Sequence, residues 1–312
     1  MIHPLKKFGF WNFESSNLNF FPQKPVIVTA EQSFHGRTLA ALTATAQPKY
    51  HKGFGYGGEM VPGFDNCKYN DIASLEAAVE RATSDGKGLA AIMLEPLQGE
   101  GGIIPGDVDF FAKARELCDK HGALLMCDEV QAGMGRTGTL WGHEQVGVIP
   151  DVFTSAKALG GGVPIGAMVA RGEAATTFGP GDHASTYGGN PLACAAGLAV
   201  AQYMSDHNIL ENVKARGEQL SQGLEDLAER YPNVLGDVRG WGLLRGVECI
   251  AEDITAGELV GAAMEQGLLL VPAGANVVRF VPPLIISEDE MNLALEKFEA
   301  AIKLKAGADL QP

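Results

Sequence analysis

The chain has 312 residues, 46% of them hydrophobic and 7% aromatic, so it is long enough for two domains with sizeable cores. Its formal net charge of −14 argues against nucleic acid or an anionic membrane as a partner, because both require a basic face. The five cysteines are scattered without CxxC spacing and the seven histidines form no HxxxH pattern, which argues against a disulfide framework and a metal centre.

Residues 1–23 are rich in aromatic side chains but show neither a strand period nor a helix period. The first residues lack the apolar core of a secretory signal, and no window of about 18 apolar residues occurs along the chain. We therefore expect an atypical N-terminal segment and a cytoplasmic protein.

Regular elements begin at Lys24. We expect a strand at PVIVTAE, a turn and helix at SFHGRTLAALTATA, and a long loop over residues 51–66. After the loop we expect an amphipathic helix at DIASLEAAVERATSDG, a buried strand at GLAAIMLEP and another helix at DFFAKARELCDKHG. Glu95 ends the buried strand, and the loop that follows brings Glu100 close to it. Paired acids suggest a glycosidase, but no second glycosidase feature accompanies them.

The next two strands carry an acid and a lysine. ALLMCD ends at Asp128 and DVFTSAK ends at Lys157, and both runs read as strands buried on two faces, as in a parallel sheet. The 20 or so residues between them are long enough for a parallel crossover. Asp128 and Lys157 are therefore expected at the same edge, where open α/β sheets bind ligands.

A carboxylate and a lysine held in a dry crevice suit pyridoxal phosphate. The lysine forms a Schiff base with the aldehyde, and the acid keeps the pyridine nitrogen protonated, with burial lowering the lysine pKa. An ordinary salt bridge is the alternative for any single pair. Glycines 160–162 leave room for a bound ring, and Gln131 adds an amide that can reach a phenolic oxygen.

The rest of the chain divides into two parts. IGAMVAR is expected as a further strand, and an alanine-rich helix follows Pro191. From Asp206 onward a charged helix, a hairpin-like strand pair, and a helix, strand and helix indicate a small α+β domain. We predict a large domain over residues 24–205 and a small one over 206–312.

Four ordered motifs carry a resemblance to a known family: LEPLQGEGG, DEVQAGMGRTG, SAKALGGGVPIGA and STYGGNPLA. They resemble class III aminotransferases, over roughly Lys24 to the C-terminus. The resemblance implies the fold of fold-type I pyridoxal phosphate enzymes: a mostly parallel α/β sheet flanked by helices, with IGAMVAR as its one antiparallel strand, plus a smaller C-terminal α+β domain.

The resemblance also implies roles for individual residues. Lys157 and Asp128 would be catalytic, and the cofactor would additionally contact Phe34, Glu95, Gln131 and Thr186. The hydroxyl of Thr186 would bind the phosphate of the cofactor in the neighbouring subunit, which implies a homodimer. The substrate would meet Arg37, Glu100 and Arg279, the last alternating between a substrate carboxylate and Glu100.

The activity implied is transfer of the ω-amino group of N-acetylornithine to 2-oxoglutarate. FHGRT favours this donor, although ornithine, succinylornithine and 4-aminobutyrate aminotransferases share the motifs. A glutamate-1-semialdehyde aminomutase would use the same lysine and acid without 2-oxoglutarate. A third hypothesis is a non-catalytic homologue that serves as an interaction partner.

Family members carry about a hundred further residues before the strand at Val26, with a turn that holds the cofactor phosphate at a helix N-terminus. We expect this chain to lack that turn and to bind pyridoxal phosphate weakly. We also expect the edge of IGAMVAR to be uncovered and prone to association.

Overall fold

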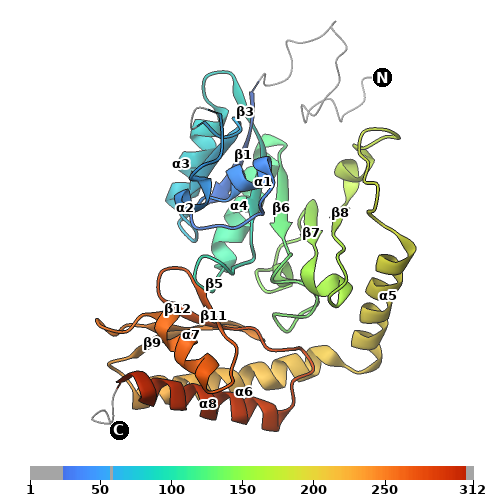
Figure 1. Cartoon of the computed structure of the whole chain (residues 1–312). Helices are drawn as coiled ribbons and strands as arrows, with labels where there is room; N and C mark the ends of the chain where they lie inside the picture. Colours follow the sequence, from blue (N-terminus) through green and yellow to red (C-terminus); the bar gives the residue numbers. More distant parts are fainter. Residues whose placement is uncertain (1–23, 57–58, 307–312) are drawn as a thin grey trace, which may run out of the picture. The chain divides into compact units, whose positions relative to one another are not determined.

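The computed structural model of the chain describes residues 24–56 and 59–306 (Figure 1). The chain forms two compact units. Unit 1 contains the described residues up to Pro96 with Gly106–Gln131 and His143–Gly197, and unit 2 contains Leu97–Pro105, Ala132–Gly142 and the described residues from Leu198 onward. The prediction for residues 1–23 lies outside the described residues.

Unit 1 is built on a six-stranded sheet with the order β2-β1-β3-β6-β7-β8 (Figure 1). The strands are β1 (Lys24–Ala30), β2 (Phe64–Cys67), β3 (Lys87–Leu94), β6 (Leu124–Asp128), β7 (Val152–Ser155) and β8 (Ala167–Ala170). The first five pair in parallel, and β8 pairs antiparallel to β7 at one end of the sheet. The predicted mostly parallel sheet with one antiparallel strand is confirmed.

Helices α3 (Ile72–Thr83) and α4 (Val108–His121) pack against the parallel strands. Asp71 caps α3 by accepting a hydrogen bond from the Ser74 N–H at 2.9 Å, and Gly122 ends α4 in the left-handed conformation at φ 63°. These local signals explain why both helices were predictable from the sequence.

Two short elements were not expected. The predicted long loop over residues 51–66 is wrong at its end, because β2 begins at Phe64 and pairs with β1. Its short polar sequence FDNC lacks the apolar run of a buried strand, and pairing with a neighbour decides its conformation. The short helix α2 (Pro48–His51) is the second unexpected element. Helix α1 (Leu39–Ala44) lies within the predicted turn and helix, so that prediction is confirmed.

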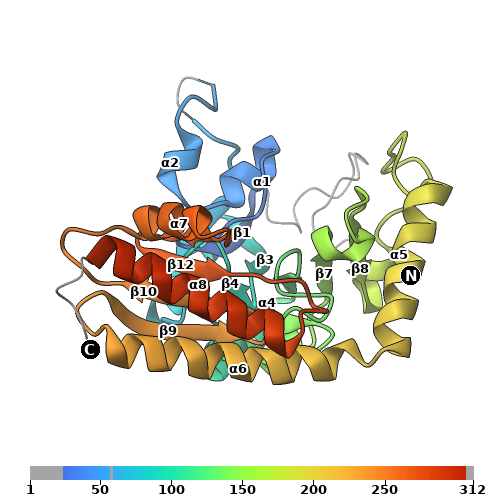
Figure 2. The ribbon, with the colours of Figure 1, turned by 60° about the horizontal axis from the view of Figure 1, so that its bottom comes forward.

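Unit 2 contains a four-stranded antiparallel sheet with the order β11-β12-β10-β9. Its elements are β9 (Leu235–Trp241), β10 (Leu244–Cys249), β11 (Val271–Ala273), β12 (Val277–Phe280), and helices α6 (Ile209–Arg230), α7 (Ala256–Glu265) and α8 (Glu288–Ala306). Helices α6 and α8 lie side by side, and their apolar faces form one core with the sheet (Figure 2).

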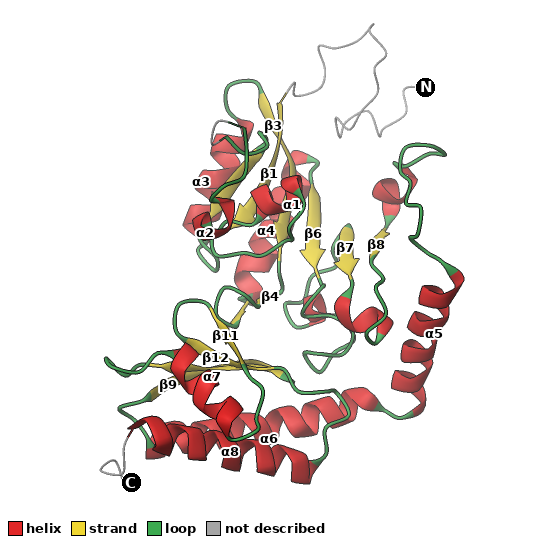
Figure 3. Ribbon diagram, in the orientation of Figure 1, coloured by secondary structure: helices red, strands yellow, loops and turns green. Residues whose placement is uncertain are grey.

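Two earlier segments, Leu97–Pro105 and Ala132–Gly142, also belong to unit 2. Strands β4 (Leu97–Gln98) and β5 (Ile104–Pro105) form a small hairpin in what the sequence indicated was a loop. Figure 3 draws α5 (Pro191–Asp206) as a helix. It begins in unit 1 and ends in unit 2. The division into domains of residues 24–205 and 206–312 stays a proposal. None of the described helices is long and apolar enough to cross a membrane.

Candidate functional site

Asp128 and Lys157 follow neighbouring parallel strands of unit 1. Asp128 is the last residue of β6 and pairs with Thr154 of β7, and Lys157 comes three residues after Thr154. The two residues thus emerge at the carboxyl edge, as expected. Lys157 opens a short 3-10 helix at φ 44°, a conformation that costs a non-glycine residue about 1–3 kcal/mol and is typical of functional positions.

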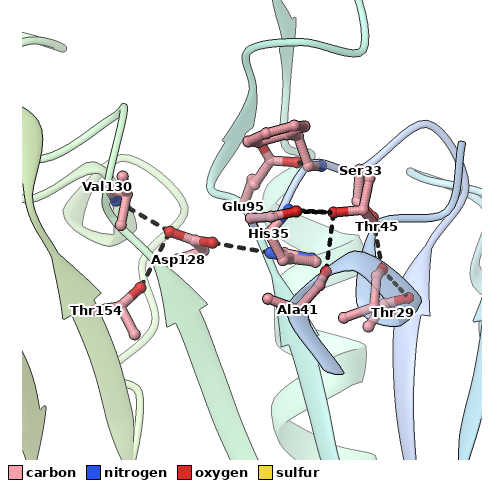
Figure 4. A network of polar contacts seen from close by, with 12 residues as sticks. Thr29, Ser33, His35, Ala41, Thr45, Glu95, Asp128, Val130 and Thr154 are labelled. Carbon is pink, nitrogen blue, oxygen red and sulfur yellow. Dashed lines mark hydrogen bonds and ion pairs between the residues drawn. The ribbon is translucent and has the colours of Figure 1, made fainter. Parts of the chain in front are cut away.

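The carboxylate of Asp128 is held by three groups (Figure 4). Its Oδ1 accepts hydrogen bonds from the Val130 N–H at 3.1 Å and from Thr154 Oγ1 at 3.0 Å. Its Oδ2 lies 2.9 Å from His35 Nδ1, which must be the donor because a carboxylate only accepts. With 6% of its side chain exposed, Asp128 is an oriented, buried negative charge.

His35 is a site residue to which the sequence analysis gave no role. Its side chain is fully buried, and the contact with Asp128 spans 93 positions of the chain. Burial alone would lower the pKa of His35, but the hydrogen bond to Asp128 and the charges of Glu95 and Asp128 raise it above the ordinary 6.5. A histidine next to the predicted Phe34 was the only signal in the sequence.

Glu95 and Phe34 are joined through the backbone. The Phe34 N–H donates to Glu95 Oε2 at 3.0 Å, and Glu95 is almost fully buried just after β3. The His35 N–H donates to Thr45 Oγ1 at 2.8 Å, so both neighbouring N–H groups are fixed. The segment after β1 is therefore held rigidly beside the end of β3 (Figure 4).

Four further predicted site residues of unit 1 are exposed or half-buried. Lys157, Thr186 and Arg37 are exposed, and Gln131 is half-buried three residues after Asp128. The dry crevice expected around Lys157 stays a prediction, and in the described chain the Lys157 side chain is exposed. The Arg37 guanidinium lies over the rings of Phe34 and Tyr50.

The predicted carboxylate-binding residues of unit 2 form an ion pair. Arg279 Nη1 of β12 lies 2.6 Å from Glu100 Oε1, and Arg279 is 7% exposed. Glu100 belongs to the turn between β4 and β5, whose backbone also accepts a 2.9 Å hydrogen bond from the Gly274 N–H. The arginine is thus held ready for a carboxylate, with Glu100 as its partner in this structure.

The residues around Asp128 fit a polar cofactor such as pyridoxal phosphate. Two buried polar atoms near the strand ends, His35 Nε2 and Ser155 Oγ, have no hydrogen-bond partner within the described residues. Buried polar atoms of this kind are costly unless a ligand or water satisfies them. The buried carboxylate is, in addition, the acceptor that a protonated ring nitrogen needs.

The profile of the family described as aminotransferase class-III matches residues 10–302. The acetylornithine aminotransferase of a Nostoc species is 56% identical over 281 residues, which are 90% of this chain and 65% of that protein. The chain thus spans about two thirds of the length of the curated relatives it matches.

Solved structures give the same result. The N-acetylornithine aminotransferase of Stenotrophomonas maltophilia superposes with a TM-score of 0.72 at 40% identity, covering 90% of this chain and 66% of that one. An ornithine aminotransferase of Toxoplasma gondii, whose structure reveals partial occupancy of pyridoxal phosphate at the active site, gives 0.81 at 32% identity over 90% of this chain and 65% of that one. Sequence motifs, sheet order and both comparisons agree that the chain belongs to the class-III aminotransferase family.

Proposed function

We propose that the chain performs the chemistry of a pyridoxal phosphate-dependent acetylornithine aminotransferase, passing the ω-amino group of N-acetylornithine to 2-oxoglutarate. The observation that carries the proposal is the buried, triply held carboxylate of Asp128 beside the strand that leads to Lys157. The relatives named acetylornithine aminotransferase support the choice of donor.

Bound pyridoxal phosphate supplies a reactive aldehyde and a ring that withdraws electrons from the substrate. Asp128 would hold a proton on the ring nitrogen, and His35 would keep the Asp128 carboxylate oriented and charged. Lys157 would hold the cofactor covalently and, once its amine is released, would take the proton from the substrate carbon that bears the amino group and deliver it to the cofactor. Phe34 would lie against the ring, and the Gln131 amide would reach its phenolic oxygen.

The substrate carboxylates would be bound by arginines. Arg37 would hold the α-carboxylate of the donor, and Arg279 would exchange Glu100 for the second carboxylate of 2-oxoglutarate. Arg279 Nη1 lies 2.6 Å from Glu100 Oε1, so the substrate carboxylate would compete with Glu100 for that guanidinium nitrogen.

We also propose a cytoplasmic homodimer. Thr186 lies in an exposed stretch over residues 181–189, as expected of a segment that reaches a neighbouring subunit's cofactor phosphate. Residues of β8 are exposed as well, so a second copy of the chain would bury both.

Substitution of Asp128 by Asn tests the proposal. A neutral amide cannot stabilise a protonated ring nitrogen, so we expect turnover to fall by about three orders of magnitude or more. Circular dichroism should show an unchanged fold, and Asp119→Asn on the exposed surface of α4 is the matched control. Near-normal turnover in the Asp128 variant would show that another acid serves the cofactor.

Two assays separate the alternatives. Added pyridoxal phosphate should give a protein-bound visible chromophore that Lys157→Ala abolishes, and a chain without such a chromophore would be a non-catalytic homologue. Comparing N-acetylornithine, ornithine, succinylornithine and 4-aminobutyrate as donors identifies the substrate. Product formed without any oxo-acid acceptor would indicate an aminomutase instead.

A further inference from the structure

Arg37 lies on a platform of aromatic rings in unit 1. Its guanidinium carbon is 4.5 Å from the ring centroid of Tyr50 and 5.2 Å from that of Phe34. The two rings meet edge to face, with centroids 5.7 Å apart and planes inclined by 79°. Lys49 Nζ lies 4.9 Å from the Tyr50 centroid, so two cations share one ring.

The platform is fixed to the segment that carries Arg37. Gln47, which precedes α2, donates from Nε2 to the carbonyls of Gln32 and Ser33 at 2.9 Å each. His51, at the end of α2, places Nε2 2.8 Å from the Leu42 carbonyl and 2.7 Å from that of Thr45. Tyr50 lies between these two attachment points, so its ring position is set relative to the end of β1, from which Arg37 follows.

The Arg37 guanidinium keeps its hydrogen-bonding capacity. The Arg37 side chain is exposed. Within residues 24–56 and 59–306 the guanidinium donates no hydrogen bond and forms no ion pair. A cation–π contact uses the charge of the guanidinium and none of its N–H donors. The donors therefore remain available for the two oxygens of a carboxylate.

The charge around this platform favours the same ligand. The chain carries a net charge of −14, yet Arg37 and Lys49 gather on one tyrosine. Two cations held this close together attract anions and raise their local concentration. Holding a long side chain in place beforehand also reduces the ordering cost when the ligand binds.

We propose that Tyr50 is a positioning residue that holds Arg37 ready to receive a substrate carboxylate. The inference rests on the proposed function for the identity of the substrate, and it adds a residue on which recognition of that carboxylate depends. Lys49 adds charge to the site, and the Tyr50 ring supplies the geometry. The hydroxyl of Tyr50 is not needed to position Arg37.

The test uses glutarate, an unreactive dicarboxylate, as a probe on the full chain with pyridoxal phosphate present. Calorimetry should show that Tyr50→Leu raises the glutarate Kd about threefold to thirtyfold, the range that loss of a cation–π contact allows. Tyr50→Phe should stay within about twofold of the unchanged chain, because it keeps the ring. Tyr56→Leu is the matched control, since Tyr56 is 96% exposed.

Kinetics give a second measurement. Tyr50→Leu should raise KM for carboxylate-bearing donors by a similar factor and leave kcat within about twofold. A diamine without the α-carboxylate should react equally with both proteins. In Arg37→Gln, the added Tyr50→Leu change should cause no further loss, because Tyr50 acts through Arg37.

The outcomes of the two measurements are distinct. Equal glutarate affinity in Tyr50→Leu and the unchanged chain would overturn the inference, as would no glutarate binding by the unchanged chain, or Tyr50→Phe behaving like Tyr50→Leu. If the glutarate Kd values change as expected among the Tyr50 variants but no amino group is transferred, the proposed function fails and the carboxylate site stands. If amino transfer occurs and the glutarate Kd is the same in all Tyr50 variants, the proposed function stands and the role of Tyr50 fails.

Discussion

Two consecutive helices differ sharply in how much of themselves they bury. Of the 16 residues of α5 only Ala193 is buried by the described chain, whereas α6 buries seven of its 22 residues. Leu198 of α5 is 60% exposed, and Leu220 of α6 is fully buried. Both helices contain enough apolar residues for a core, so the difference lies in what covers them.

The pattern of apolar residues explains the contrast. In α6 they recur on one face, which packs on β9, β10 and α8, and charged residues cover the other face. In α5, PLACAAGLAVAQYMSD is apolar around most of its circumference, which is typical of a helix covered on several sides. Strand β8 and the segment with Thr186 share this exposure. The exposed part of the chain is therefore where we place the second subunit.

The largest expected effect compares the same substitution in the two helices. Leu220→Ala in α6 should lower the free energy of unfolding by about 2–5 kcal/mol, because it leaves a cavity in the core of unit 2. Leu198→Ala in α5 should change it by less than about 0.5 kcal/mol when the protein is dilute. Urea denaturation measures both values.

Protein concentration sharpens this comparison. If a second copy covers α5, the Leu198 variant should become less stable than the unchanged chain as the concentration rises. A loss of several kcal/mol for Leu198→Ala at all concentrations would show that α5 is covered within the monomer.

The buried polar interior of unit 1 should respond to pH, unlike exposed α5. Because the pKa of His35 is raised in the folded protein, its contribution to stability is complete below the ordinary value of 6.5 and is lost as the pH rises through the folded value. His35→Asn should cost about 1–3 kcal/mol near pH 6 and flatten stability above pH 6.5. If the free energy of unfolding of this variant depends on pH as that of the unchanged chain does, another group causes the pH dependence.

A charge on β8 should act on association more than on folding. Val169 is 43% exposed on the end strand, so Val169→Lys should leave the free energy of unfolding of dilute protein within about 0.5 kcal/mol. The same charge should weaken self-association severalfold, because lysine disfavours pairing at a sheet edge. Sedimentation velocity measures the self-association of the variant. Unchanged self-association would show that the contact between subunits does not involve β8.

The smallest effect is expected on the surface of unit 2. The hydrogen bond from Arg230 lowers the pKa of Glu299 to about 2 against the opposing effect of burial, and Lys303 contributes as well. This stabilisation is present above the ordinary pKa of 4.5 and is lost as the pH falls towards 2. Since Arg230 is 40% exposed, Glu299→Gln should cost only about 0.5–1 kcal/mol at pH 7 and nothing near pH 2, measured by urea denaturation.

Local sequence was sufficient for much of the fold. The apolar runs that end at Asp128 and near Lys157 predicted two buried parallel strands, and parallel strands bring their carboxyl ends to one edge whatever their order. Asp71 and Gly122 marked helix ends because a cap acts on backbone groups within a few residues. Motif spacing then identified the acid and the lysine without any knowledge of their surroundings.

The sequence by itself thus determined which residues stand at the sheet edge, and the tertiary structure decided what each of them contacts. His35 reaches Asp128 across 93 positions, Arg279 reaches Glu100 across 179, and Tyr50 lies under Arg37 because Gln47 and His51 attach α2 to the end of β1 and to α1. Propensity, capping and periodicity act over a few residues, whereas these contacts depend on strand order and on the packing of distant segments.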